Sequence, residues 1–450
     1  MMWIFLFFPF VLWGQPSLRS GQILHEWNTV LTEVILQDGF TPPVASRIYV
    51  YPNVAAYEAL VAFNKEWVSL AGQLKGLSGL PVPSAGVNYH PGIVAAVAFA
   101  ETAKELVWRD YLIDELKTAH LNTLRKETPD TTTYRASIVY GKQIAQAIMD
   151  WAKKDNYNQS RTYPKVIGYN EPGQWVPTSP TYGPAVEPHW HTIRTMVLDS
   201  ASQFNPGPPI PFSTDPNSEF YKANLALYQL SKKLTRKQKL IASFWDCNPQ
   251  VSMQRGHLMM LRRQISPGGH WILITQTACK KKKLSLMESA EVYAMVSIGL
   301  FEGFISCWQE KYNSKLLRPE TYITQYIDPN WQPLLETPLF PEHTSGHSVI
   351  SNASAVILTH FFGKKFSYVD STEMFLGLPP RKFKSFLQAA EEAGMSRHYG
   401  GIHYLPAIKL GMKQGRNVAY YILSKIKTRK EEQNSSNNKT SASLLPVEKK

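Results

Sequence analysis

The spacing of apolar residues restricts the fold of this chain more than any other feature. Between residues 285 and 308, apolar side chains recur at helical intervals, at Leu286, Val292, Val296, Leu300 and Phe304. The same period marks segments 23–36, 54–63, 93–107, 111–124, 133–152, 218–230, 236–245, 345–362, 382–393 and 402–426, whereas the alternation typical of strands is weak throughout. We therefore predict an all-α protein built from helical bundles.

Several residues mark the ends of these predicted helices. Thr41-Pro42-Pro43 is expected to separate the first two segments, because proline cannot continue a helix. Asn53 is a suitable N-cap for the second segment. Gly363 and Gly394 follow two later segments, and glycine readily adopts the left-handed conformation that ends a helix. We therefore predict that these two helices end at residues 362 and 393.

Residues 157–216 differ in composition from the predicted helices. Proline, glycine, tyrosine and tryptophan crowd together there, and so long an irregular stretch in a compact protein usually has a function or wraps a core. We expect this wrapping segment to drape over the helices and to form one lip of a functional site. The predicted organisation is an N-terminal helical region, 15–270, that contains the wrapping segment, followed by a C-terminal helical bundle, 285–426, that holds the site.

The two ends of the chain have distinct compositions. Residues 1–13 are almost purely apolar and are followed by Gly14-Gln15-Pro16. This stretch is too short to span a bilayer comfortably, so we expect residues 1–14 to be a signal peptide, although the charged start of such signals is missing. The protein is then exported, periplasmic or secreted, with no integral membrane domain. Residues 427–450 are rich in Lys, Glu, Ser and Asn and are predicted to be disordered.

The net charge of +13 narrows the range of partners. Part of it is local, since residues 280–283 are all lysine; solvated surface lysines and a positive field that attracts anions are both open as explanations. A nucleic-acid partner is not expected, because the sequence has no basic face with interleaved aromatic residues and no known motif. The three cysteines lack metal-ligand spacing, and their odd number argues against a disulfide framework.

Residues 341–347 carry the first group of side chains that point to a function. Thr344-Ser345-Gly346-His347 leads into a predicted helix. The Ser345 hydroxyl can cap that helix, Gly346 lets a ligand approach the backbone, and the free N–H groups of a helix start attract an anion. His347 lies in the first turn, where its ring can reach the same anion. Taken alone, this pattern is also typical of an ordinary helix cap.

Cationic residues precede this turn. Lys311 and Arg318 are seven positions apart, nearly two helical turns, so their side chains can point the same way if the helix continues through Leu317. Pro319 then stops the helix. A guanidinium group suits tetrahedral and trigonal oxyanions, and a lysine adds a compact charge. A surface Lys and Arg at a helix end would give the same pattern.

A third group follows the turn. Arg397 and His403 lie on either side of a Gly400-Gly401 bend, where the last predicted helix begins. Each of the three groups alone could arise by chance. Their order and spacing together indicate a site that binds one small oxyanion.

The three groups also resemble a known family. Lys-x6-Arg-Pro, Ser-Gly-His and Ser-Arg-x5-His, at 311–319, 345–347 and 396–403, are similar to the three-part signature of the vanadium-dependent haloperoxidase and type 2 phosphatidic-acid phosphatase superfamily. The N-terminal segments 40–49 and 53–58 look like the openings of the large, soluble, bacterial haloperoxidase-type members. The resemblance therefore extends over most of the chain.

The resemblance implies roles for individual residues. Vanadate or phosphate would be held at its equatorial oxygens by three cations and a helix start, namely Lys311, Arg318, Arg397, Ser345 and the Gly346 N–H. His403 would be the axial ligand of vanadium, or the nucleophile toward phosphorus in a phosphatase, and His347 would be the acid–base residue. One pocket serves both chemistries, because vanadate readily takes the five-coordinate geometry of phosphoryl transfer and positive charge stabilises both.

Two aromatic residues bear on the choice between these chemistries. Trp308 and Phe340 lie near the first two motifs. Fungal chloroperoxidases of the family are similar at both places, where an aromatic wall shapes the halide side of the pocket. The resemblance thus implies a halide pocket at Trp308 and Phe340, while simple packing of the bundle is the alternative explanation.

The sequence departs from the family at one position. The family usually has an aspartate four residues after the last histidine, which orients the ring of that histidine, and here the position is Ala407. Another group, such as a backbone carbonyl, must then orient His403. The departure puts the basicity of His403 in question.

Three functions are compatible with these features. The first is a vanadium-dependent haloperoxidase, with vanadate as cofactor, that oxidises iodide or bromide with hydrogen peroxide to hypohalous acid. The second is a soluble acid phosphatase that acts through a phosphohistidine at His403 on phosphate monoesters or lipid phosphates. The third is a non-catalytic bundle that binds anions. Only small molecules are expected as partners, and the chain can form an oligomer.

Overall fold

The computed structural model describes residues 21–249, 251–255 and 258–430. The helices in this part of the chain are α1 (Gln22–Asp38), α2 (Pro42–Val61), α3 (Pro91–Lys104), α4 (Asp110–Glu127), α5 (Thr131–Ala152), α6 (Tyr157–Ser160), α7 (Glu219–Lys232), α8 (Arg236–Phe244), α9 (Pro267–Lys282), α10 (Leu286–Ser314), α11 (Pro319–Tyr326), α12 (Gly346–Phe362), α13 (Phe386–Tyr399) and α14 (Leu405–Lys425), with short 3₁₀ helices η1 (Trp190–Thr192) and η2 (Met374–Leu376).

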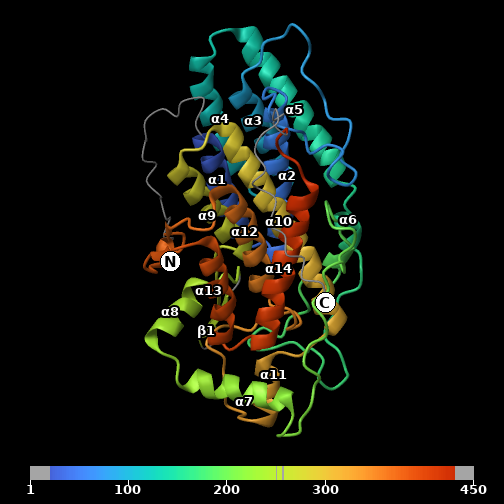
Figure 1. The fold of residues 1–450 in the computed structure, drawn as a ribbon, viewed down its shortest axis with the longest axis vertical. Coiled ribbons are helices and arrows are strands. Elements are labelled where there is room, and N and C mark those ends of the chain that lie inside the picture. The colour runs from blue at the N-terminus through green and yellow to red at the C-terminus, as the bar shows by residue number, and fades with distance from the viewer. Residues whose placement is uncertain (1–20, 250, 256–257, 431–450) are drawn as a thin grey trace, which may run out of the picture.

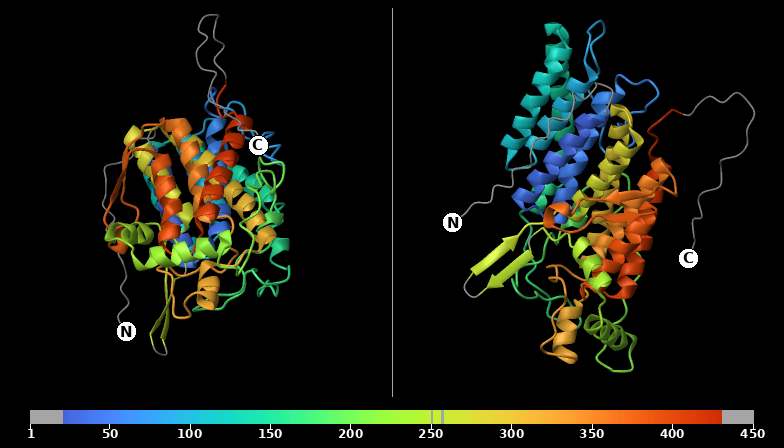
Figure 2. Two further views of the ribbon diagram at one scale, coloured as in Figure 1. Left: turned by 60° about the horizontal axis from the view of Figure 1, so that its bottom comes forward. Right: turned by 90° about the vertical axis from the view of Figure 1, so that its left-hand side faces the viewer.

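Short strands form two antiparallel hairpins among these helices. They pair β1 (Val251–Arg255) with β2 (Leu258–Arg262), and β3 (Tyr368–Asp370) with β4 (Arg381–Phe383). Figure 2 shows the β1–β2 hairpin projecting from the body of the helices. Because helices make up the rest of the regular structure, the prediction of an all-α protein built from helical bundles is confirmed.

Helix α10 packs against helices from both parts of the chain, namely α2 near the N-terminus and α12 near the C-terminus. Ser285 and Glu288 cap its start reciprocally in a capping box, which satisfies two of the free N–H groups of the first turn. Helix α2 packs against α3 and α10, and α12 packs against α10, α13 and α14. In Figure 1, α4 and α5 lie at one end of the elongated molecule and α7 and α11 at the other. The end of α10 reaches the region between these groups, where the candidate site lies.

The apolar surface of α10 is buried inside the protein. Leu286–Ser314 is long and apolar enough to cross a membrane by length and composition alone, yet its most apolar window is completely buried against other helices. Such burial is what the central helix of a large bundle requires. Among the described residues, no other helix meets the same criteria of length and composition.

Helix α2 differs from the prediction at its start. The prolines at 42 and 43 begin the helix, since proline is tolerated where the first N–H groups have no helical partner. Asn53 is not an N-cap but lies in the interior of α2, just after Pro52. Its side-chain amide exchanges two hydrogen bonds with that of Asn28 in α1, of 2.9 and 3.0 Å. The predicted start at Asn53 was wrong. The sequence alone does not distinguish an asparagine that caps a helix from one that pairs with a distant asparagine in the core.

Helix α13 lies further along the chain than predicted. It begins at Phe386 with Ser385 as its N-cap and continues to Tyr399, whereas the prediction placed it at 382–393. Gly394 is inside the helix, and a Cβ there would come within 2.5 Å of Met412 Cε and 3.0 Å of Ser348 Oγ. This glycine allows α13 to approach its neighbours closely and does not end the helix. The predicted end at residue 393 was therefore wrong.

Helix α9 lay outside the predicted helices. It begins with Pro267-Gly268-Gly269, a sequence typical of turns, and ends in the lysine run. Ser266 caps it by accepting a hydrogen bond of 3.1 Å from the Gly269 N–H. A Cβ at Gly269 would come within 2.8 Å of Tyr49 Oη, so close packing explains this glycine. The Pro-Gly-Gly start of α9 is typical of a loop, although residues in the middle of the helix are buried.

The wrapping segment has little regular structure. Within 157–216 only α6 and η1 are helical. The Trp175 N–H donates to Lys315 O at 2.7 Å, and the Val186 N–H donates to Leu339 O at 2.8 Å. The segment therefore runs across the end of α10 and beside the loop that precedes α12.

The ends of the chain are only partly described. The predicted signal peptide and residues 431–450 lie outside the described residues. Residues 427–430 were predicted to belong to a disordered tail, but they pair with the loop after α2 and with α10. The Lys430 N–H donates to Glu66 O at 2.9 Å, and Arg429 forms a 2.7 Å ion pair with Glu291 of α10. The prediction was wrong for these four residues, because their partners are far away in sequence.

Candidate functional site

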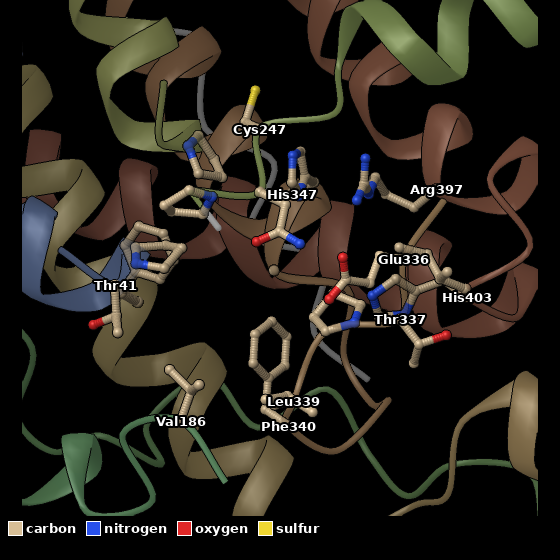
Figure 3. Close-up of a pocket in the computed structure, with 18 of the residues that line it drawn as sticks. Thr41, Val186, Cys247, Glu336, Thr337, Leu339, Phe340, His347, Arg397 and His403 are labelled. Carbon is tan, nitrogen blue, oxygen red and sulfur yellow. The ribbon is translucent and has the colours of Figure 1, made fainter. Parts of the chain in front are cut away.

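A cavity of about 270 Å³ lies where the turn between α1 and α2 meets the C-terminal helices. Its walls include several of the residues singled out from the sequence, namely Trp308, Phe340, Gly346, His347, Arg397 and His403. In Figure 3, His347, Arg397 and His403 approach one region of the pocket, and Phe340 lies across from them. Thr181 and Val186 from the wrapping segment complete part of the wall.

Lys311 lies behind this wall, in the last turn of α10. The helix ends at Ser314, because Lys315 adopts a left-handed conformation with φ 52°. The condition that the helix continues through Leu317 is therefore not met. The Lys311 ammonium is fully buried and donates to Pro341 O at 2.9 Å and to Glu342 O at 3.0 Å. These carbonyls hold the ammonium in the loop that precedes α12.

Arg318 is positioned by a second helix and not by α10. It is the N-cap of α11, with Pro319 as the first helical residue. Its Nε donates to Phe340 O at 2.8 Å and its Nη1 to Ile402 O at 2.9 Å. Arg318 Nη2 is buried and has no hydrogen-bond partner in the described part of the chain, so one nitrogen of the guanidinium is available to a ligand. Lys311 and Arg318 meet in space although no single helix joins them.

The ring nitrogens of His403 have different partners. Arg318 Nη1 lies 3.1 Å from Nε2, and arginine can only donate, so Nε2 is the accepting nitrogen. The proton must then sit on Nδ1, which donates to Glu342 Oε1 at 2.7 Å. The lone pair of Nε2 is thereby turned toward the buried cations. His398 supports the same residue, with its Nδ1 3.1 Å from His403 O.

Glu342 is the functional residue that the sequence reasoning missed. It replaces the aspartate that the family usually has at the position of Ala407, and the suggested backbone carbonyl is not the partner of His403 Nδ1. The same carboxylate accepts the Tyr404 N–H at 3.0 Å. Burial raises the pKa of Glu342 to about 7, while Arg318 and Lys311 oppose that shift. The only sequence signal was an acid two residues before the Thr344-Ser345 turn.

The start of α12 is built as the sequence predicted. Ser345 is the N-cap and its hydroxyl accepts from the Ser348 N–H, and the Ser345 N–H itself donates to Ala407 O at 3.2 Å. Gly346 lines the cavity, so no side chain stands between the helix start and a ligand. His347 follows in the first turn, and within residues 21–249, 251–255 and 258–430 its Nε2 has no hydrogen-bond partner. Backbone N–H groups and one free imidazole nitrogen thus face the same space.

Arg397 enters the cavity from the last turn of α13. Its Nη1 donates to Trp245 O at 2.9 Å, and its Nη2 lies 3.5 Å from Asp246 Oδ1. The segment after α8 therefore fixes this guanidinium. That segment had no assigned role in the sequence reasoning.

The site concentrates positive charge away from water. Lys311, Arg318 and Arg397 are each at most 2% exposed. Burial lowers the pKa of Lys311 to about 7 and that of Arg318 to about 10. Burial, reinforced by these cations, also holds the pKa of His403 well below its usual range, so the ring is neutral. Because buried cations are costly without a counter-charge, an oxyanion in the cavity would offset that cost.

Phe340 and Trp308 form an aromatic wall beside the cations. Their ring centroids are 4.9 Å apart with an interplanar angle of 50°. Lys311 Nζ lies 5.0 Å and Arg318 Cζ 4.9 Å from the Phe340 centroid, within cation–π range. Trp308 Nε1 donates to Val186 O at 3.2 Å. Both rings line the cavity and also pack the bundle, so the predicted halide role stays a prediction.

Comparisons with known proteins give a family and a fold. Residues 324–431 match the model of the second helical-bundle domain of vanadium chloroperoxidase. The crystal structure of a bacterial vanadium-dependent iodoperoxidase is 42% identical, covers 92% of this chain and 98% of its own, and superposes with a TM-score of 0.87. A holo-type bacterial vanadium-dependent chloroperoxidase is 16% identical, with coverages of 86% and 95% and a TM-score of 0.64. Comparison with curated proteins gives no match.

Proposed function

Since the chain belongs to the vanadium-dependent haloperoxidase superfamily, we propose that it binds vanadate and oxidises iodide or bromide with hydrogen peroxide to hypohalous acid. The similarity to a bacterial iodoperoxidase makes iodide the first halide to test. The substrates are small and the cavity of about 270 Å³ is large enough to hold an oxyanion with peroxide or halide beside it.

The proposal rests on the hydrogen bonds of His403, which place the ring proton on Nδ1 and leave the lone pair on Nε2. A metal binds the unprotonated nitrogen of a neutral imidazole, and the second nitrogen usually donates to a carboxylate. Glu342 supplies that carboxylate at 2.7 Å. His403 Nε2 therefore presents its lone pair where Arg318 now donates. On binding, Arg318 would turn this N–H to an oxygen of the anion.

The surrounding donors fit a vanadate group. Lys311, Arg318 and Arg397 supply the positive charge, and Arg318 Nη2 is a buried donor to which the described residues offer no acceptor. The Gly346 N–H and the Ser345 hydroxyl supply neutral donors at the start of α12. When bound, vanadate supplies an electrophilic metal centre that activates hydrogen peroxide and leaves its own oxidation state unchanged.

His347 would move the protons. Burial and the charge of Arg397 hold its pKa well below the usual range, so the ring is neutral and can accept a proton. Its Nε2 has no hydrogen-bond partner among the described residues. His347 would take a proton as hydrogen peroxide binds and return it to the oxygen that leaves as water. Phe340 and Trp308 provide an apolar, polarisable wall for a weakly hydrated halide.

The test is to add orthovanadate to metal-free protein and to follow the formation of triiodide from iodide and hydrogen peroxide. We expect activity that saturates with vanadate and disappears in His403→Ala. Inactivity toward both iodide and bromide at saturating vanadate would refute the proposal.

The second candidate is a phosphatase, because the same cage and the same His403 lone pair suit an in-line attack on phosphorus. Hydrolysis of p-nitrophenyl phosphate without vanadate, together with no halide oxidation in its presence, would favour this function. Phosphohistidine trapped on His403 would identify the nucleophile.

A further inference from the structure

A second cluster of buried ligand-type side chains lies just outside the oxyanion cage. Cys247 follows α8, His270 lies in the first turn of α9, and Glu373 follows the β3 strand. All three are at most 2% exposed. The proposed function uses none of them, and only Cys247 reaches the wall of the cavity.

The three side chains aim one ligand atom each at a common point. His270 Nδ1 lies 3.5 Å from Cys247 Sγ and 3.2 Å from Glu373 Oε1. The three atoms lie within 4.8 Å of one another. Zinc bond lengths of about 2.3 Å to sulfur and about 2.05 Å to nitrogen or oxygen, at tetrahedral angles, give edges of about 3.6 Å for N···S and about 3.4 Å for N···O. The two measured distances agree with these edges.

The second ring nitrogen of His270, Nε2, has the partners expected of a metal-binding histidine. His270 Nε2 lies 2.8 Å from Asp370 Oδ2 and 2.7 Å from Thr372 Oγ1. Thr372 in turn donates to Asp370 Oδ1 through its hydroxyl, at 2.7 Å, and its N–H, at 3.0 Å. A carboxylate that accepts from the second ring nitrogen is the usual support of a metal-binding histidine. It leaves the Nδ1 lone pair facing Cys247 and Glu373.

The Glu373 carboxylate gives a second sign of a missing ligand. Its Oε1 is buried and accepts no hydrogen bond from the described residues, although it lies 3.2 Å from His270 Nδ1. A buried carboxylate oxygen without a donor is costly unless a cation satisfies it. The metal-free explanation is an ion pair, in which His270 carries both protons and shares them between Asp370 and Glu373. In that arrangement Cys247 Sγ, 3.5 Å from His270 Nδ1, would be a second and weaker acceptor of the Nδ1 proton.

We propose that Cys247, His270 and Glu373 bind a zinc ion, with Asp370 orienting the histidine. The thiolate, imidazole and carboxylate are a donor set that zinc prefers, and three protein ligands leave the fourth position to water. The ion joins the segment after α8 to α9 and to the β3 region. Trp245 stacks on His270 with ring centroids 4.5 Å apart, and its carbonyl holds Arg397. The zinc therefore braces one wall of the oxyanion cage.

Metal analysis of the full-length protein tests the proposal directly. We expect one zinc per chain by mass spectrometry of the purified protein. This result should hold whether or not vanadate is bound and whether or not the protein oxidises halide. Protein produced in cobalt medium should show thiolate-to-cobalt charge transfer in the near ultraviolet. Cys247→Ser should abolish that band, while Cys279→Ser, which removes another buried cysteine, should keep it. Asp370→Asn should weaken zinc binding about 10- to 100-fold.

X-ray absorption at the zinc edge keeps the test independent of how well the variants fold. The wild-type spectrum should contain one sulfur ligand at about 2.3 Å and lighter ligands at about 2.0–2.1 Å. Protein that contains no zinc after incubation with Zn²⁺, or a spectrum with nitrogen and oxygen ligands only, would overturn the proposal in favour of the ion pair. Equal zinc content in wild type and Cys247→Ser would overturn it as well.

Discussion

Glu342→Gln removes the charge that fixes the proton of His403 while it keeps the size of the side chain. In the wild type the His403 Nδ1–H donates to Glu342 Oε1 at 2.7 Å, and both groups are buried. A hydrogen bond to a charged partner contributes about 1.5–3 kcal/mol, which corresponds to about 10- to 150-fold in a dissociation constant. We therefore expect vanadate to bind at least about tenfold more weakly to the variant, in line with the loss typical of a ligand's supporting carboxylate.

An opposing effect must be weighed against this loss. The substitution also deletes a negative charge that lowers the positive potential of Lys311 and Arg318. Any anion would gain from that deletion, whether or not it bonds to His403. Phosphate separates the two effects, because it enters the cage without forming a metal–nitrogen bond. Glu342→Gln should bind phosphate as tightly as the wild type or more tightly, while it binds vanadate more weakly.

The assay measures both affinities on the same protein. Metal-free enzyme is titrated with orthovanadate by calorimetry and by recovery of iodide oxidation, and phosphate is titrated alone and in competition. Glu310→Gln is the matched control, since Glu310 is also buried, and burial raises its pKa to about 7 as well. Its nearest ionic partner is His343, at 3.9 Å, and not His403. The control should leave the ratio of vanadate to phosphate affinity unchanged.

Two results would refute the reasoning. If Glu342→Gln weakened vanadate and phosphate equally, the carboxylate would serve the shape of the pocket and not the basicity of His403. If Glu310→Gln reproduced the loss of vanadate affinity, any buried acid near the cations would have the same effect. Either outcome would return the orientation of His403 to an unidentified group.

Three further predictions follow from the same structure. Phe340→Ala removes two cation–π contacts, each worth about 0.5–2 kcal/mol, so vanadate affinity should fall about 5- to 900-fold while Phe340→Tyr retains it; calorimetry measures this, and a change in halide KM alone would contradict it. His347→Ala should lower kcat for iodide oxidation about 100- to 10,000-fold with little change in vanadate affinity, and retention of kcat would exclude the proton-transfer role. Burial lowers the pKa of His25 from 6.5 to about 3; its neutral form stabilises the fold above pH 6.5 and that contribution is lost as the pH falls, by about 2 kcal/mol at pH 5. His25→Gln should therefore lose about 2 kcal/mol less than wild type between pH 7.5 and pH 5 in urea unfolding, and an unchanged pH dependence would contradict this assignment.

The sequence predicts local features well and long-range partners poorly. The N-cap at Ser345, the bend at Gly400-Gly401 and the helical period of α10 each depend on a few adjacent residues, and the structure contains all three. Glu342 has no such local signal. Its carboxylate meets His403 across 61 positions in the chain, and an acid before a turn looks like any solvated residue.

The convergence of Lys311 and Arg318 was predicted on the condition of a continuous helix, and the structure does not meet that condition. A continuous helix would have placed both on one face, but α10 ends at Ser314 and Arg318 caps a different helix. The two side chains still meet, because both donate to carbonyls of the same loop. The seven-residue spacing of Lys311 and Arg318 therefore brings the two side chains together without the continuous helix that the spacing suggests.

Glycine gave the least reliable information. Gly394 was interpreted as a helix end, and it lies inside α13 where a side chain would strike Met412. Gly269, in the first turn of α9, made a buried helix look like a turn. In a protein whose helices pack this closely, a glycine can mark close approach between helices or a helix end, and the tertiary contacts distinguish the two.

The loop at 340–342 shows how His403 can be oriented without the aspartate that the family usually has. The carbonyl of Phe340 accepts from Arg318, those of the next two residues accept from Lys311, and the Glu342 side chain accepts from His403. Three consecutive residues thus position two cations and the candidate metal ligand. An acid in this loop does the work of one on α14, because orientation of an imidazole depends on where the carboxylate lies and not on its place in the sequence. The backbone carbonyl of Ala407, which does not depend on the side chain at this position, accepts from the Ser345 N–H and so holds the start of α12.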